Sequence, residues 1–150
     1  MDEDNFSPLV ASNAAEHALL RSEVSVILAA LEETSGLRRA GELSRLVDVF
    51  CKRMTQHFEH EERSWSEVQE LLADPAFRRW SAELCAQHRQ LETRLRAVLD
   101  ELWAAHAAAS EPSPSVDQVL RGFFADLGAH ELAERHMLER PSFEDLGERG

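Results

Sequence analysis

Apolar residues recur at helical spacing along nearly the whole chain, and turn-forming residues divide them into four segments. No stretch alternates apolar and polar residues as a half-buried strand does, and Ala, Leu, Glu and Arg dominate. The dividing residues are Ser7-Pro8, Ser35-Gly36, Asp74-Pro75 and the Ser- and Pro-rich run 110–115. We therefore predict four helices, over residues 8–34, from after Gly41 to Asp74, from Pro75 to 108 and over 115–140.

Three short connections between helices of similar length favour antiparallel neighbours. The predicted fold is all-α, an up-down-up-down four-helix bundle. A chain of 150 residues is long enough to bury a core, so we expect one domain over residues 1–150, with its core at about 8–140. The acidic N-terminus and the tail from Pro141 to Gly150 are expected to be peripheral.

Ionisable residues interrupt the apolar stripe of every predicted helix. In chain order they are His17, His57 with Glu61, His88, and His130 with Glu134. One inward histidine is more often a hydrogen-bonded core residue than a ligand. Counting about 1.5 Å per residue from the helix ends, however, places the four histidines near one level, with the loosest agreement, about 7 Å, between the last two helices.

The motif HxxxE occurs twice, as His57 to Glu61 and as His130 to Glu134, and this spacing puts both side chains on one helix face. Each pair can offer a nitrogen to one metal and a carboxylate that bridges two. Nitrogen and oxygen ligands suit non-haem iron, so we expect two iron ions with an oxo or hydroxo bridge, and manganese or zinc as less favoured alternatives. Cys51 and Cys85 are expected to be reduced, fairly buried thiols away from the level of the histidines.

This order of motifs, His, HxxxE, His, HxxxE, resembles that of the hemerythrin-like domain family over about residues 8–140. The resemblance implies a four-helix bundle around a non-haem di-iron centre. The residues that match the family's ligand positions are His17, His57, Glu61, His88, His130 and Glu134.

Some residues near these motifs leave alternatives open. The oxygen-carrying hemerythrins have a further histidine on the third helix where this chain has Glu92, which either ligates or points to solvent. His60 is either a partner of a ligand or a partly exposed helix residue. We assign Glu62 to the charged outer face of its helix, with no special role, and Trp65 to packing.

The formal charge of −12 argues against nucleic acid and anionic membranes as partners. An acidic N-terminus and the lack of a long apolar run lead us to expect a cytoplasmic protein. The resemblance implies chemistry with small ligands, namely hydrogen peroxide, nitric oxide or dioxygen. We expect an oxidoreductase, most simply one that decomposes peroxide. The alternatives are a dioxygen- or iron-binding sensor or storage module, which would need a separate protein partner, and a bundle whose buried His and Glu only bond one another.

Overall fold

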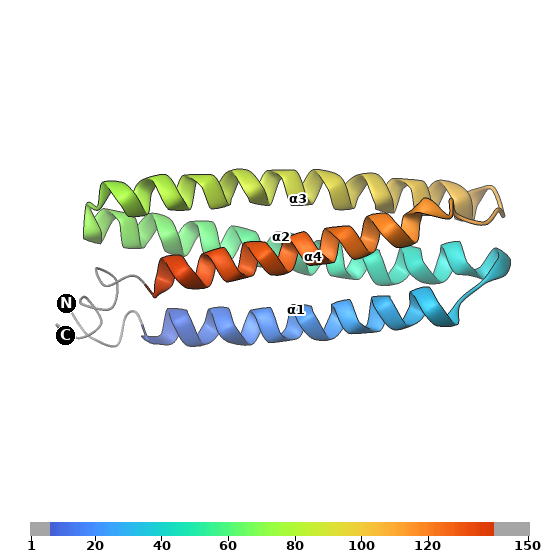
Figure 1. The fold of residues 1–150 in the computed structure, drawn as a ribbon, viewed down its shortest axis with the longest axis horizontal. Helices are drawn as coiled ribbons and strands as arrows, with labels where there is room; N and C mark the ends of the chain where they lie inside the picture. The colour runs from blue at the N-terminus through green and yellow to red at the C-terminus, as the bar shows by residue number, and fades with distance from the viewer. Residues whose placement is uncertain (1–6, 140–150) are drawn as a thin grey trace.

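The computed structural model describes residues 7–139, with side chains from residue 12 onward (Figure 1). The terminal segments that the sequence predicts to be peripheral lie outside the described residues. Within 7–139, none of the helices combines the length and hydrophobicity that a membrane span requires.

Four long helices run side by side along one axis (Figure 1). They are α1 (Ser7–Glu33), α2 (Arg39–Leu72), α3 (Pro75–Ala107) and α4 (Ser115–Leu138), with the short 3-10 helix η2 (Gly36–Arg38) before α2. Each long helix packs against the two that flank it, in the ring α1, α2, α3, α4 and back to α1. This arrangement confirms the predicted all-α, up-down-up-down bundle.

The helix ends lie close to the predicted positions, with one difference at the start of α2. Gly36 adopts a φ of +69°, which glycine tolerates best, and so turns the chain after α1. Asp74 accepts a hydrogen bond from the backbone N–H of Ala76 (2.9 Å) and caps α3. Gly41 lies inside α2 rather than before it, and the close approach of the His106 ring favours glycine there, because a Cβ would come within 2.8 Å of Nδ1 of His106.

The connection between α3 and α4 explains how His88 and His130 lie level although the sequence analysis gave these two helices the loosest agreement. His88 lies 19 residues before the end of α3 at Ala107, whereas His130 lies 15 residues after the start of α4 at Ser115. This difference of four residues corresponds to about 6 Å along a helix. α3 therefore extends past the start of α4, and the connection over residues 108–114 runs back along the bundle (Figure 1).

The apolar core consists of two clusters. The larger cluster, which includes Phe58 and Leu91, fills the bundle toward the connections α1–α2 and α3–α4. The smaller one, formed by Trp65, Val68, Phe77, Leu84 and Met137, lies near the α2–α3 connection. Glu61, His88, His130 and Glu134 lie along their helices between the members of the two clusters, and His57 directly precedes Phe58, the last member of the larger cluster on α2. A polar layer thus divides the core.

Candidate metal centre

The structure brings the six predicted site residues together in this polar layer. All six are buried, and the most exposed, His17, keeps 7% of its surface. His17 and His57 have ring centroids 4.8 Å apart, and His88 and His130 have centroids 4.7 Å apart. Each helix contributes one histidine, as the stripe pattern predicts.

Two overlapping groups of ligand atoms result, each with all its atoms within 4.8 Å of one another. The first group is His17, His57, Glu61 and Glu134, and the second is His88, His130, Glu61 and Glu134. Both groups therefore contain the same two carboxylates and a different pair of imidazoles.

The carboxylates contact both histidine pairs directly. Glu61 lies 3.2 Å from Nε2 of His57 through Oε1, and the same oxygen lies 3.4 Å from Nε2 of His88. Glu134 places Oε2 3.0 Å from Nε2 of His17 and Oε1 2.5 Å from Nε2 of His130. The shared carboxylates therefore lie between the two pairs.

Most of these buried atoms lack a hydrogen bond of acceptable geometry. The set comprises Nε2 of His17, His57 and His130, both carboxylate oxygens of Glu61, and Oε2 of Glu134. Burying polar atoms without a hydrogen bond is costly, and each of these groups is a good ligand for a divalent cation. A bound cation would satisfy them together, so the donor set fits a metal ion.

The pKa values in the cluster show that its carboxylates favour protonated histidines. Burial opposes a charge on His17, but the carboxylates of Glu134 and Glu61 outweigh it and raise the pKa of His17 to about 10. The same two carboxylates outweigh burial at His88 and raise its pKa to about 9. Burial favours the neutral acid at Glu134, but Glu61 and the surrounding histidines hold its pKa well below the usual range. Protons on the imidazoles thus balance the carboxylates where a cation could do so.

A carboxylate on α1 that the sequence analysis missed holds the outer nitrogen of His57. Glu16 accepts hydrogen bonds from Nδ1 of His57 through Oε2 and from Nδ1 of His60 through Oε1, the latter at 2.8 Å. Burial raises the pKa of Glu16, but these histidines outweigh it and lower the pKa overall. His60 is 45% exposed and is connected to His57 only through Glu16. It is thus both a partly exposed residue and an indirect partner of a predicted ligand.

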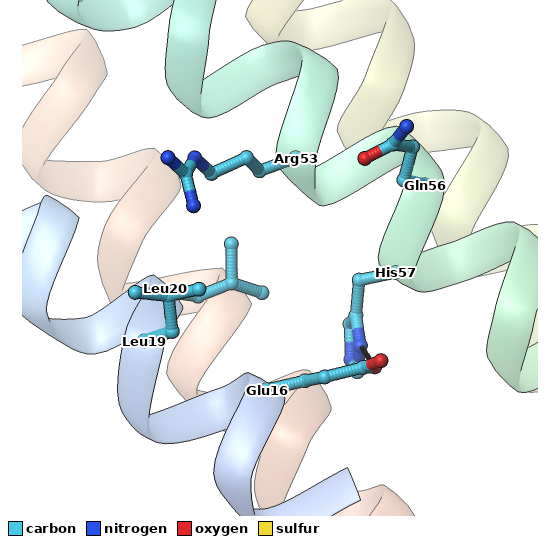
Figure 2. A pocket seen from close by; sticks show the side chains of 6 residues that line it. All are labelled: Glu16, Leu19, Leu20, Arg53, Gln56 and His57. Carbon is cyan, nitrogen blue, oxygen red and sulfur yellow. Dashed lines mark hydrogen bonds and ion pairs between the residues drawn. The ribbon is translucent and has the colours of Figure 1, made fainter. Parts of the chain in front are cut away.

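Glu16 and His57 line a surface hollow of about 170 Å³ between α1 and α2 (Figure 2). Figure 2 shows their side chains converging at one edge of the hollow, with Arg53 farther off on α2. Leu19, Leu20 and Gln56 complete the lining. Glu16, 34% exposed, therefore lies between solvent in the hollow and the buried His57.

His130 has a neutral partner at the corresponding place. Gln87 accepts a hydrogen bond from Nδ1 of His130 through its amide oxygen at 2.7 Å. Glu16 directly precedes His17 and bonds the histidine of the next helix, and Gln87 directly precedes His88 and does the same. This repetition in the two halves is a sequence signal that could have identified both residues.

Glu62 is a correction to the sequence analysis, which gave it no special role. Its Oε2 lies 3.5 Å from Nδ1 of His88 and also pairs with Arg89. The ring of His88 stacks on Phe58, with centroids 3.8 Å apart and planes at 11°, and on Trp65 at 5.4 Å and 24°. Trp65 thus packs, as predicted, but against a predicted ligand.

The structure also resolves the position of Glu92. None of the ligand groups found among the described residues includes Glu92, which instead lies 3.7 Å from Nη1 of Arg89. Its side chain is partly buried, so it neither joins the cluster nor points freely into solvent.

Both cysteines are free, as predicted, but one is nearer to the histidines than expected. Burial and the charge of Glu62 raise the pKa of Cys85 to about 11, and burial also raises that of Cys51. The Sγ of Cys85, an oxygen of Glu62 and a nitrogen of His88 lie within 4.8 Å of one another. The physical reason is that Cys85 lies about one turn before His88 on α3.

Glu131 is a further buried carboxylate beside the cluster. The sequence analysis missed it because it placed His130 and Glu134, and not Glu131, on the inward stripe of this helix. Its nearest ion pair is with Nη1 of Arg21 at 3.7 Å. Burial raises the pKa of Glu131, and the charges of His17 and Arg21 oppose the rise. This side of the cluster therefore carries an additional acid.

The geometry agrees with the family model that matches this chain. A family model described as the hemerythrin HHE cation-binding domain matches residues 11–140. Comparisons with curated proteins and with solved structures gave no significant match. The family match spans all four helices and contains all six predicted ligands. The chain therefore belongs to the hemerythrin HHE cation-binding domain family.

Proposed function

We propose that the protein binds two iron ions at this centre, with His17 and His57 on one and His88 and His130 on the other. The observation that carries the proposal is the pair of overlapping ligand groups that share Glu61 and Glu134. Four imidazole nitrogens and two carboxylates form a mixed donor set of the kind that non-haem iron uses. Manganese and zinc accept the same donors and are tested by the metal analysis below.

We propose further that the centre reacts with small oxidants, and that its main reaction is the decomposition of hydrogen peroxide. When bound, the iron pair supplies two electrons by cycling between ferrous and ferric states. All six ligands are buried, which favours a substrate small enough to reach a buried centre. Peroxide decomposition needs no separate electron donor, because one molecule is reduced to water while a second is oxidised to dioxygen. The chain's carboxylates and imidazoles hold the centre and exclude bulk water.

Metal analysis with an absorption spectrum and an oxygen electrode tests both proposals. We expect about two irons per chain and one dioxygen released for every two peroxides consumed. Glu134→Gln should lose most bound iron, because Glu134 contacts histidines of both pairs, whereas His106→Gln, at an exposed position, serves as the matched control. Zinc, or no metal, in the purified protein would reject the iron centre. Two irons without peroxide turnover would reject the peroxide reaction alone.

A second candidate function is a dioxygen- or iron-binding module without turnover. The observation that favours it is the origin of the ligands on all four helices, which links metal occupancy to the packing of the whole bundle. A stable spectral adduct with dioxygen or nitric oxide, formed without consumption of peroxide, would select this function. The cytoplasmic location stays a prediction from the sequence.

A further inference from the structure

The two halves of the centre, His17/His57 and His88/His130, differ in the residue that accepts a hydrogen bond from the outer nitrogen, Nδ1, of one histidine. At equivalent positions, one residue before the histidines of α1 and α3, the chain has Glu16 and Gln87. Glu16 bonds His57 and Gln87 bonds His130. One half thus has a carboxylate acceptor where the other has an uncharged amide.

Glu16 is held firmly in this role. Its two oxygens bond two different histidines of α2, His57 and His60, so the carboxylate is fixed at both ends. The side chain is 34% exposed at the edge of the hollow between α1 and α2 (Figure 2). The acceptor is therefore charged, oriented and only partly screened by solvent.

The other carboxylates near the two halves do not remove this difference. Glu131 is buried near His17 and pairs with Arg21 at 3.7 Å. In the other half, Nδ1 of His88 has no hydrogen bond, and Glu62, 3.5 Å from it, is paired with Arg89. Each half thus has one further carboxylate paired with an arginine, and the difference between the halves lies in Glu16 and Gln87.

A carboxylate that accepts the outer N–H of an imidazole fixes its tautomer and makes its other nitrogen a stronger donor to a cation. An amide acceptor fixes the tautomer as well but adds no charge. We propose that Glu16 is a positioning residue which makes the His17/His57 half hold its metal ion more tightly than the His88/His130 half, with His60 keeping Glu16 in place. This inference rests on the proposed two-metal centre.

Anaerobic titration of the metal-free protein with ferrous ion, followed by calorimetry, tests the inference. The wild type should bind two ions in two distinguishable steps. Glu16→Gln, which preserves shape but removes the charge, should weaken the tighter step by about 10–100-fold and leave the other within about threefold. His60→Ala should weaken the same step by a smaller factor. Gln87→Glu is the matched exchange in the other half and should strengthen the weaker step, which a merely structural role of these positions would not produce.

The outcomes separate this inference from the proposed function. Two binding steps in the wild type that Glu16→Gln leaves unchanged, or weakens equally, would overturn the role of Glu16 while the two-metal centre stands. Fewer than two ions bound by the wild type would overturn the centre and the inference with it. If circular dichroism shows that Glu16→Gln does not fold, Gln87→Glu tests the inference instead. The inference predicts that this change brings the dissociation constants of the two steps closer together, and an unchanged difference between them contradicts it.

Discussion

Binding of a divalent cation to the metal-free protein is expected to release at least two protons per chain near pH 7. The cluster holds the pKa of His17 at about 10 and that of His88 at about 9, so both imidazoles carry an extra proton at neutral pH. A metal needs the ligating nitrogen free of its proton. Glu134 contributes none, because its pKa is held low and the carboxylate is already ionised.

The size of the effect follows from these values. Each displaced proton changes the apparent affinity by about tenfold per pH unit, so two protons give about 100-fold per unit. The steep region extends from neutral pH to about 9, where His88 titrates, and the slope then decreases until His17 titrates at about 10. Metal affinity should therefore rise steeply with pH in the range where an isolated histidine would already be neutral.

Isothermal titration calorimetry at pH 7, in two buffers with different heats of ionisation, counts the released protons. His17→Gln should release about one proton fewer per chain. His106→Gln, at an exposed position outside the cluster, should match the wild type. A wild-type release of about one proton or fewer would refute the reasoning, because it would mean that at least one of the two imidazoles is neutral before the metal binds.

Three further outcomes are expected. The pKa values of His17 and His88 lie above the ordinary 6.5. Their stabilising contribution is therefore complete below pH 6.5 and is lost as the pH rises through 9 and 10. Urea unfolding of the metal-free protein should show that its free energy of unfolding falls over that range. A chelator should lower the Tm in scanning calorimetry. A ligand at 1,000 times its Kd adds about 4 kcal/mol to the free energy of unfolding, which corresponds to roughly 8–16 °C in Tm for a domain of this size. An unchanged Tm would contradict metal binding. Leu95→Ala, at a fully buried core position, should cost about 2–5 kcal/mol in urea unfolding with the metal content unchanged. Leu132→Ala, at a side chain 48% exposed, should stay within about 0.5 kcal/mol, and equal losses would contradict the assigned core.

The fold and the meeting of the six site residues were predictable because both depend on regular geometry. Helical periodicity determines which side chains face inward, and the constant rise of a helix determines which of them lie level. His57 and Glu61 illustrate this: their spacing of four residues puts both side chains on one face of α2, where Nε2 and Oε1 lie 3.2 Å apart.

The contacts around the ligands were not predictable in the same way, because they depend on how each helix is rotated toward its neighbour. Glu16 was assigned no role, yet it bonds a histidine 41 residues later in the chain. Glu62 was assigned to the outer face, but its Oε2 lies 3.5 Å from Nδ1 of His88 on α3.

The division of the core by a polar layer has a consequence for cooperativity. Two apolar clusters that meet across a polar layer need not unfold together, because the buried polar atoms without a hydrogen bond weaken their connection. His88, whose ring stacks on Phe58 of one cluster and Trp65 of the other, links them physically. We expect amide hydrogens near the α2–α3 connection to exchange earlier than those of the larger cluster in the metal-free protein, and the two regions to exchange as one unit once a cation joins the four helices.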